Sequence, residues 1–442
     1  MEVLVMKHFS KKVTACAVSL AVLSGLMTGC SGSDSGSVST EKQASSEESL
    51  LLWTFSPDDL KQDVIDYEAK TGVKVEVVGL PWNDYQTKLM QAARSGEGMP
   101  DIFVVDNSFA KKWIENDNIG MNFSKEYPDF VKKYEEDYYD VMVEVGRDSA
   151  GDLRGVTLQY PIGMLYYQRD IAKEVLGSDD PEVVAEATNS VEKLIALGDK
   201  ITETYGGERK LAGNETEFTT TYLSVRPEPY VKDGKIIIND YITGLFDIDK
   251  EMYEKGMFAS ENGGDACITS MTAGTHFLDF SPTWGYALNL KNAIAGTEME
   301  GRWGVTSPTW SNYRGGSWFQ VYKNSAKKDQ AIAFLEFLLF DEDTIYKNIL
   351  DRGDFTSNKK VAKRLVESGY EDPVLGNQQL YAAFQKEAER TEVNNVDTVY
   401  DDEAKNRLTD ALKSYKTGAL TLEEALEEYK AALKNAYPEL TE

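Results

Sequence analysis

Aromatic side chains near predicted strand ends and loops are the residues of this chain best suited to recognise a ligand. A flat ring packs against the C–H face of a pyranose, while neighbouring polar groups pair with the sugar hydroxyls. Trp284 lies between a proline-containing turn and a glycine, and Trp318 follows two glycines, so both rings begin at breaks in regular structure. The full set is Trp53, Phe55, Trp82, Trp284, Tyr286, Trp310, Tyr313, Trp318 and Phe319. This pattern favours sugar recognition, and core packing is the alternative interpretation for most of these rings, Trp53 and Trp82 included.

Polar residues close to these rings could pair with ligand hydroxyls. The candidates are Asp58, Asp106, Asn107 and Ser317. Asp58 also lies at a predicted helix start, where a carboxylate stabilises the helix dipole. A capping role is therefore the alternative interpretation for this residue.

Motifs for the common nucleotide, metal and nucleophile chemistries are absent. The chain has no Gly-rich phosphate loop, no paired-cysteine zinc spacing, no Gly-X-Ser-X-Gly serine elbow and no metalloprotease helix motif. His276 is the one histidine left once the leader with His8 is removed, and we expect it to be a hydrogen-bonded structural residue. Asp247, Asp249 and Glu251 alternate as calcium ligands do but lack the loop glycine, which favours a solvated acidic face. We expect no metal, no cofactor and no enzymatic activity, although a glycosidase would need only two carboxylates.

The N-terminal segment has the features of an export signal. A basic start, an apolar run over residues 13–27 and small residues directly before Cys30 are typical of a bacterial lipoprotein signal. The apolar run is shorter than the ~20 residues that a spanning helix needs. We predict cleavage of residues 1–29 and lipidation of Cys30, with an ordinary secretory signal as the alternative. Residues 30–49, rich in Ser, Gly and Glu, predict a flexible tether.

Composition limits the class of protein and its partners. The remaining chain is long enough for two domains, and 41% hydrophobic residues suffice for sizeable cores, which excludes a disordered chain. A formal net charge of −27 repels phosphate backbones, so we expect no nucleic-acid partner. Cys267 stands alone once Cys16 leaves with the signal and Cys30 is lipidated, which excludes an intramolecular disulfide.

Strand and helix patterns alternate over the first part of the exported chain. Residues 50–55, 73–77 and 102–105 carry strand patterns, and helical spacing separates them. Asn83 and Gln86 fit a capping box for the second helix. This order implies an α/β fold with a parallel sheet flanked by helices. Ligands of such sheets bind beyond the carboxyl ends of the strands, which are residues 53–56, 79–82 and 106–108.

Three later segments carry local signals. Asp233 and Gly234 lie between two short strand-like runs and predict a hairpin. Residues 331–340 are apolar around most of a helix but too short to cross a bilayer, so they predict a buried helix. Thr421 and Glu424 form a capping box for the final helix. We find no internal repeat.

Short motifs along the chain also carry a family resemblance. In order, they are Trp53, Thr54 and Phe55; Thr71 and Gly72 before Val73, Lys74 and Val75; Pro100, Asp101 and Ile102; Tyr160, Pro161 and Ile162 leading to Tyr166, Tyr167, Gln168, Arg169 and Asp170; Trp303, Gly304 and Val305; Gly315, Gly316 and Ser317; and residues 331–338 and 418–426. In order and spacing, this set resembles the bacterial extracellular solute-binding proteins of family 1, the maltose-binding-protein-like group of sugar transport. The likeness covers nearly everything after the tether.

The resemblance implies a fold and its domains. It implies the α/β, two-lobed periplasmic-binding-protein type II fold, in which each lobe is a mostly parallel sheet flanked by helices and a hinge joins the lobes. Both lobes would be discontinuous in sequence. The N-lobe would comprise residues 50–160 and 300–325, and the C-lobe residues 161–299 and 326–442.

The resemblance also implies ligand contacts. Together with Trp82 from the strand-end argument, the candidate contacts are Phe55, Asp58, Asp106, Asn107, Ser108, Tyr160, Trp284, Ser317 and Trp318. The maltose-binding pattern has a tryptophan at the third strand end, where this chain has Val104 and Val105. Maltose specificity is therefore not carried over.

The function that the resemblance implies is transport. We expect a lipid-anchored receptor at the outer face of the cell membrane that captures a carbohydrate, an oligosaccharide in particular, by hinge closure and presents it to the permease subunits of an ABC importer. We expect a monomer. Ser31 after the lipidated cysteine suits a Gram-positive cell. The alternatives are a receptor for another small polar solute, such as a polyamine, and a secreted glycosidase.

Overall fold

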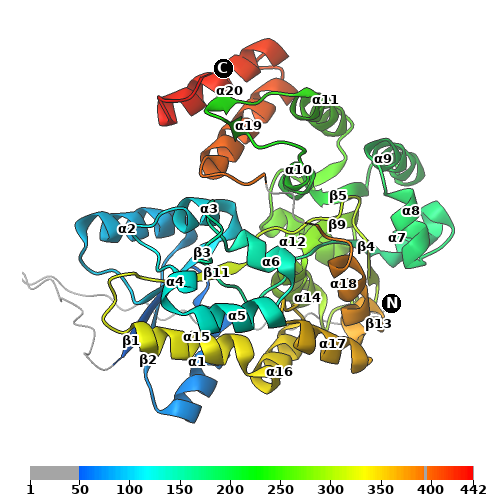
Figure 1. Ribbon diagram of the computed structural model, residues 1–442. Coiled ribbons are helices and arrows are strands. Elements are labelled where there is room, and N and C mark those ends of the chain that lie inside the picture. The colour runs from blue at the N-terminus through cyan, green and yellow to red at the C-terminus, as the bar shows by residue number, and fades with distance from the viewer. Residues whose placement is uncertain (1–48, 393–395, 442) are drawn as a thin grey trace, which may run out of the picture. The chain divides into compact units, whose positions relative to one another are not determined.

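The computed structural model describes residues 49–392 and 396–441 (Figure 1). The predicted signal, the lipidation site Cys30 and nearly all of the predicted tether lie outside these residues. Within them the chain forms two main sheets and two short two-stranded pairs.

The first sheet has the strand order β11-β3-β1-β2. Strand β1 (Leu50–Thr54) is parallel to β2 (Val75–Gly79) and to β3 (Ile102–Asp106), as the alternating patterns predicted. Strand β11 (Ser317–Val321) comes much later in the chain and pairs antiparallel with β3. Residues 102–105 are completely buried, as expected for a strand covered on both faces.

Helices from both ends of the chain cover this sheet. Helix α1 (Pro57–Thr71) ends at Gly72, whose φ of 75° provides the left-handed C-cap. Helices α15 (Lys328–Phe340) and α16 (Glu342–Arg352) pack against α1, and the Tyr67 and Phe334 rings lie 5.1 Å apart. The expectation that everything after residue 326 belongs to the other lobe is therefore wrong for α15 and α16, because their apolar face completes the core of the first sheet. We call this sheet and its helices the first lobe.

Two further helices connect the strands of the first sheet. Helix α2 (Trp82–Ser95) follows β2, and α3 (Asn107–Ile114) follows β3. The capping box predicted at Asn83 and Gln86 is absent, because the N-cap of α2 is Pro81, two residues earlier, which offers no side-chain oxygen. Gln86 instead donates a hydrogen bond to Asp402, at 3.2 Å.

The second sheet has the order β10-β4-β9-β5-β8. Its strands are β4 (Gly163–Gln168), β5 (Lys210–Asn214), β8 (Phe258–Ser260), β9 (His276–Pro282) and β10 (Trp303–Thr306). Strand β5 is parallel to β8 and β9, whereas β4 is antiparallel to β9 and β10. Strand β10 was expected in the N-lobe with β11, but it pairs with β4, since a strand pattern does not specify the partner strand. We call this sheet and the helices on it the second lobe.

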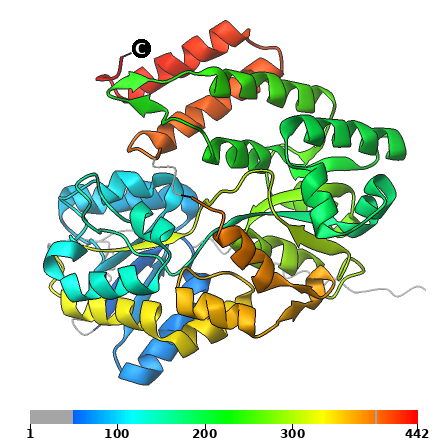
Figure 2. The same ribbon diagram turned by 45° about the vertical axis from the view of Figure 1, so that its right-hand side comes forward.

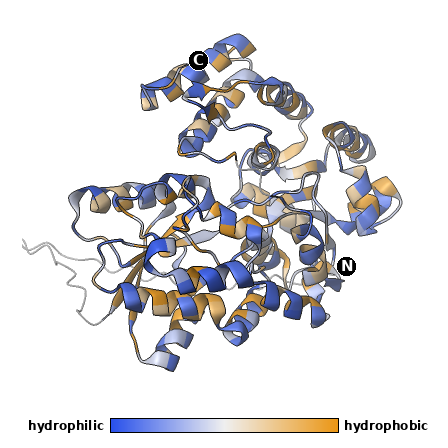
Figure 3. Ribbon diagram, in the orientation of Figure 1, coloured by the Kyte–Doolittle hydropathy of each residue, from blue (hydrophilic) through white to orange (hydrophobic). Residues whose placement is uncertain are grey.

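A helical layer and a hairpin complete the second lobe. Helices α10 (Glu215–Ser224), α11 (Asp240–Glu254), α19 (Asp401–Lys416) and α20 (Leu422–Ala436) share one apolar cluster (Figure 2). The predicted hairpin joins this cluster as β6 (Val231–Lys232) and β7 (Lys235–Ile236), with Asp233 and Gly234 at positive φ. Most helices carry both hydrophilic and hydrophobic stretches, as expected when one face packs on a core (Figure 3).

The remaining elements cover or connect the two sheets. They are α4 (Phe123–Glu126), α5 (Pro128–Asp137), α6 (Asp140–Val145), α7 (Arg169–Leu176), α8 (Pro181–Ala187), α9 (Val191–Tyr205), α12 (Asp265–Ala273), α13 (Thr283–Gly285), a π-helical turn (Tyr286–Leu290), α14 (Lys291–Ile294), α17 (Lys359–Glu367), β12 (Glu371–Asp372), a 3₁₀ turn (Pro373–Leu375), β13 (Gln378–Gln379) and α18 (Leu380–Ala388). The buried helix predicted over residues 331–340 is α15, and the capping box predicted at Thr421 is present in α20.

Candidate ligand-binding site

A cavity of about 470 Å³ is lined by residues of both lobes. From the first lobe come the start of α2 and the β3–α3 junction. From the second lobe come α10, α13 and α19, together with the segment before β11. The lining residues are Trp82, Asp106, Asn107, Ser108, Lys111, Thr216, Glu217, Thr220, Leu223, Ser224, Arg226, Tyr230, Trp284, Tyr313, Arg314, Gly315, Asp397, Thr398, Asp401 and Lys405. The position matches the rule that ligands bind beyond the carboxyl ends of parallel strands.

A second hollow of about 320 Å³ shares Trp82, Asp106 and Trp284 with the first cavity. It adds Phe55, Ser56, Asp59, Gln159, Leu288, Gly316 and Ser317. Because the two hollows share three residues, we treat them as one site and call it the cleft.

Asp106 anchors the first-lobe side of the cleft. As the N-cap of α3, it accepts hydrogen bonds from the Ser108 backbone N–H at 2.8 Å and from the Ser108 hydroxyl at 2.6 Å, both through Oδ1. Burial raises the pKa of Asp106, while the bonds from Ser108 and the nearby Lys405 ammonium lower it. Its second carboxylate oxygen makes no hydrogen bond or ion pair to the described part of the chain, so it can accept one from a ligand hydroxyl.

Two tryptophans, one from each lobe, face the cleft. Trp82 is 50% exposed, and its ring packs edge-on against Phe55 with 5.0 Å between centroids. Trp284 is half-buried, and its indole N–H donates to the Arg314 carbonyl at 3.1 Å. Gly315 has a φ of +68°, and a Cβ there would lie 2.8 Å from Trp284 Nε1. The Trp284 ring therefore occupies its position only because residue 315 has no side chain.

Ion pairs that the sequence did not predict form the second-lobe side of the cleft. Arg314 pairs with Glu217 and donates to the Phe280 carbonyl at 2.8 Å. Arg226 pairs with Asp401 and, at 3.1 Å, with Asp397. These residues come from separate segments and have no common spacing, so no sequence signal would have found them.

Lys405 is the one cation lining the cleft whose side chain has no ion pair or hydrogen bond to the described part of the chain. Burial lowers the pKa of Lys405, and Arg314 lowers it further, while the carboxylates of Glu217, Asp106 and Asp402 raise it. The lining of the larger cavity contains four acidic and four basic side chains, in a protein with 74 acidic and 47 basic residues. The larger cavity is thus formally neutral, and the second hollow adds one carboxylate, Asp59.

The predicted contacts divide into two groups. Seven of them line the cleft: Phe55, Trp82, Asp106, Asn107, Ser108, Trp284 and Ser317. Asp58 is exposed and lines neither hollow.

Two predicted contacts are core residues instead. Tyr160 is buried, and its hydroxyl donates to the Ala388 carbonyl at 3.2 Å. Trp318 is completely buried, because adjacent residues of a strand face opposite sides and Ser317 is the one that faces the cleft. Of the other aromatic candidates, Tyr286 and Phe319 are buried, whereas Tyr313 lines the cleft.

The remaining titratable candidates lie away from the cleft. His276 is buried, its Nδ1 lies 2.7 Å from the Ser270 hydroxyl oxygen, and burial lowers its pKa to about 3. Asp249 is buried in α11, close to Lys416. No three His, Cys, Asp or Glu side chains of residues 49–392 and 396–441 come together as a metal site. Over the same residues, no helix has the length and apolar character to cross a membrane.

Comparison with known proteins agrees with this arrangement. An extracellular solute-binding protein of family 1 superimposes with a TM-score of 0.76 at 18% identity, over 88% of this chain and 99% of that one. An ABC transporter associated binding protein of B. animalis subsp. lactis, in complex with β-1,6-galactobiose, gives 0.69 at 20% identity, over 88% and 97%. At this identity the likeness concerns the fold, and the shared fold is the two-lobed periplasmic-binding-protein type.

Sequence comparison identifies the family. The diacetylchitobiose binding protein DasA of Streptomyces coelicolor is 33% identical over 103 residues, a match that spans 22% of this chain and 24% of DasA. Two lobes around a polar, aromatic cleft define a binding protein for a solute. More specifically, residues 64–374 match the family described as bacterial extracellular solute-binding protein, and the chain belongs to that family.

Proposed function

We propose that this protein captures a neutral carbohydrate, an oligosaccharide in particular, between its two lobes and delivers it to an ABC importer. The observation that carries this proposal is the pair of tryptophans in the cleft, Trp82 from the first lobe and Trp284 from the second. Two aromatic faces suit the C–H surfaces of pyranose rings. The free oxygen of Asp106 and the Lys405 ammonium supply an acceptor and a donor for sugar hydroxyls.

The balance of charge in the cleft supports a neutral ligand. A polyamine receptor needs a large excess of carboxylates, but in the cleft five acidic side chains are balanced by four basic ones, to within one charge. Arg314 and Arg226 are already paired with carboxylates, so they do not constitute a free anion site. A polar, uncharged solute with many hydroxyls fits this lining best.

The ligands of similar proteins also support a carbohydrate ligand. Solved structures with this fold hold β-1,6-galactobiose or lacto-N-biose, and DasA is a diacetylchitobiose binding protein. All three ligands are disaccharides. The chain belongs to a family of binding proteins, which supports capture of the sugar without covalent chemistry. A secreted glycosidase, in contrast, would hydrolyse the sugar.

The proposal extends to the cellular location. Signal cleavage before Cys30 and lipidation of its sulfur would anchor a monomeric receptor, through residues 30–49, at the outer face of a Gram-positive cell membrane. A ligand that touches both lobes favours the closed state by its differential affinity, and the importer then recognises that state. Replacing Cys30 by Ala should release the protein into the medium, which fractionation and mass spectrometry would detect.

The test is a thermal shift of residues 31–442 against oligosaccharides, amino acids and polyamines. A ligand at about 100 times its Kd adds ~2.7 kcal/mol, roughly a 3 °C rise in Tm for a chain of this length. We expect the rise with one group of sugars and its loss in Trp284→Ala. Trp318→Ala is the matched control: it should lower the Tm of the free protein, since a buried tryptophan is worth about 3–5 kcal/mol, but keep the shift caused by the ligand.

The alternatives have distinct outcomes. A shift with polyamines alone would overturn the carbohydrate proposal. A bound sugar that is recovered hydrolysed, with new reducing ends, would show a glycosidase.

A further inference from the structure

We infer that the cleft continues into a second compartment along helix α3, and that the preferred ligand is a neutral oligosaccharide longer than a disaccharide. This inference rests on the proposed function and specifies the length and chemistry of its ligand. The compartment has a volume of about 590 Å³, and neither Trp82 nor Trp284 lines it. Together with the two hollows of the cleft it exceeds the ~300–1,000 Å³ range of small-molecule sites.

The two compartments are continuous. They share five lining residues, which mark the passage between them: Asn107, Lys111, Tyr313, Asp397 and Thr398. The first two belong to α3 in the first lobe, and the other three come from segments that connect to the second lobe. The second compartment is therefore also bounded by both lobes.

Helix α3 forms one side of both the cleft and the second compartment. Asn107 at its start lines both compartments, Lys111 lies one turn further, and Glu115 at its C-cap lines only the second. These residues share a face at a spacing of four, and eight helical residues span about 12 Å. A chain of linked sugars can follow this face, whereas a single ring would occupy only one end.

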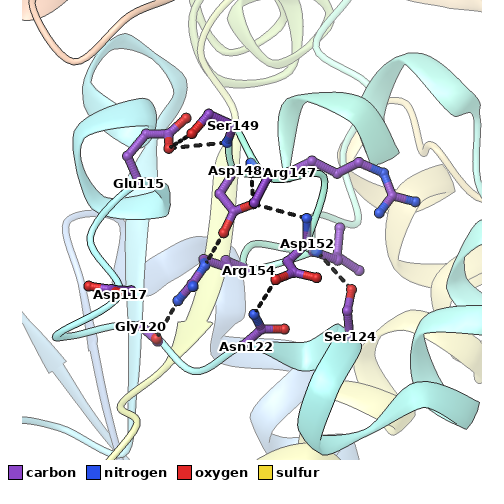
Figure 4. A network of polar contacts seen from close by, with 12 residues as sticks. Glu115, Asp117, Gly120, Asn122, Ser124, Arg147, Asp148, Ser149, Asp152 and Arg154 are labelled. Atoms are coloured by element: carbon purple, nitrogen blue, oxygen red, sulfur yellow. Dashed lines mark hydrogen bonds and ion pairs between the residues drawn. The ribbon is translucent and has the colours of Figure 1, made fainter.

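The turn over residues 147–152 closes the far end of the second compartment and is held in place by polar contacts (Figure 4). Ser149 donates hydrogen bonds from its backbone N–H and its hydroxyl to Glu115, at 3.1 and 2.9 Å. Asp148 pairs with Arg154, which also donates to the Gly120 carbonyl at 3.3 Å. Lys111 donates to the Arg147 carbonyl at 2.9 Å. A wall fixed before binding loses little entropy when a ligand arrives.

The charges of the second compartment specify its occupant. Each of its four acidic lining residues has a basic partner, in the pairs Glu115–Lys111, Glu144–Arg147, Asp148–Arg154 and Asp397–Arg226. Neither a cation nor an anion would find an unpaired counter-charge there. The carboxylate and carbonyl oxygens still accept hydrogen bonds, so the compartment suits the same neutral, hydroxyl-rich chain as the cleft.

The experiment measures Kd by calorimetry for the disaccharide and the tetrasaccharide of four series: maltose-type, β-1,4-linked N-acetylglucosamine, xylose and galactose oligomers. For the series that binds, we expect the tetrasaccharide to bind at least about tenfold more tightly, equivalent to 1.4 kcal/mol. Val399→Trp and, independently, Val145→Trp fill the second compartment and should reduce this ratio to about one. Val399 and Val145 line only that compartment.

Val183→Trp is the matched control, because Val183 is exposed on α8 and lines neither compartment. It should leave the ratio unchanged. Equal affinity of the disaccharide and the tetrasaccharide for the unmodified protein would overturn the inference and leave the carbohydrate proposal intact. So would a ratio that both tryptophan variants preserve at unchanged Tm. Binding of none of the four series would instead overturn the proposed function, and this inference with it.

Discussion

At the scale of single residues, the cleft depends on a missing side chain. Gly315 combines a positive φ with close contact to Trp284, and the carbonyl of the preceding Arg314 accepts the bond from the indole N–H. Any Cβ at residue 315 would strain the backbone and displace the ring. The conformation of one glycine thus positions one of the two rings offered to the ligand.

Gly315→Ala should therefore weaken ligand binding and lower the free energy of unfolding by about 1–2 kcal/mol. Denaturant unfolding and calorimetric titration would measure the two effects. Gly244→Ala is the control, because Gly244 lies within α11 with open space around its Cβ position, and alanine there should stabilise by about 0.5–1 kcal/mol. Unchanged affinity in Gly315→Ala would show that the Trp284 position is not set by this contact.

A second residue-scale prediction concerns pH. Burial and the nearby Glu217 carboxylate raise the pKa of Asp279 to about 7, although Arg314 lowers it. Between its ordinary value of about 3.9 and 7, the folded state holds more protons than the unfolded state, so this residue makes stability fall as pH rises through that window. Asp279→Asn should remove that fall, which amounts to about 4 kcal/mol between pH 4 and pH 8. Parallel unfolding curves of variant and wild type across this range would contradict the assignment.

At the scale of elements, local signals predicted local structure well. Strands β1, β2 and β3, the hairpin at Asp233 and the cap at Thr421 follow from patterns that neighbouring residues complete. The partner of β10 and the packing of α15 and α16 did not follow, because both depend on surfaces far away in sequence. Pairing and docking are decided by which apolar faces remain uncovered once other elements have folded.

The residues of the cleft also divide into those that local sequence signals predicted and those that depend on the fold. Asp106 could be located because it lies at the end of a predicted strand, and strand ends meet at one edge of a sheet. Trp284 could be located because a proline-containing turn and a glycine flank it. Trp318 was misplaced, since whether a strand residue faces inward depends on register. Arg314 and Lys405 could not be predicted, because charged residues are common in this chain and only the fold selects the few that converge.

The capping box of α20 provides a test at this scale. The Thr421 hydroxyl accepts the Glu424 backbone N–H, and the Glu424 carboxylate accepts the Thr421 backbone N–H in return. Thr421→Ala should lower the free energy of unfolding by about 1 kcal/mol without changing ligand affinity, because α20 lines neither compartment. Glu424→Gln retains an acceptor and should cost less. Equal losses for the two variants, measured by urea unfolding, would contradict the reciprocal cap.

At the scale of the whole molecule, binding couples the two lobes. The cleft takes Asp106 from the first lobe and Glu217 from the second, and Gln86 of α2 already bonds to Asp402 of α19. A ligand that contacts both lobes gains affinity only in conformations that bring both sets of residues to it. The difference between the ligand's affinities for the closed and open conformations therefore determines how far binding shifts the protein toward closure.

Small-angle scattering should show this coupling as a smaller radius of gyration when the bound sugar is saturating. Trp284→Ala, at the same sugar concentration, should keep the radius of the free protein because binding is lost. A saturated complex with the radius of the free protein would count against closure by the ligand.

The antiparallel pairing of β11 with β3 also affects how the chain reaches its native state. The first sheet lacks one edge until residues 317–321 are available, and its helical cover is incomplete until α15 and α16 follow. Contacts of such long sequence separation raise the contact order and slow folding. A chain synthesised from its N-terminus therefore has no finished first lobe until α16, which ends at Arg352, has been made.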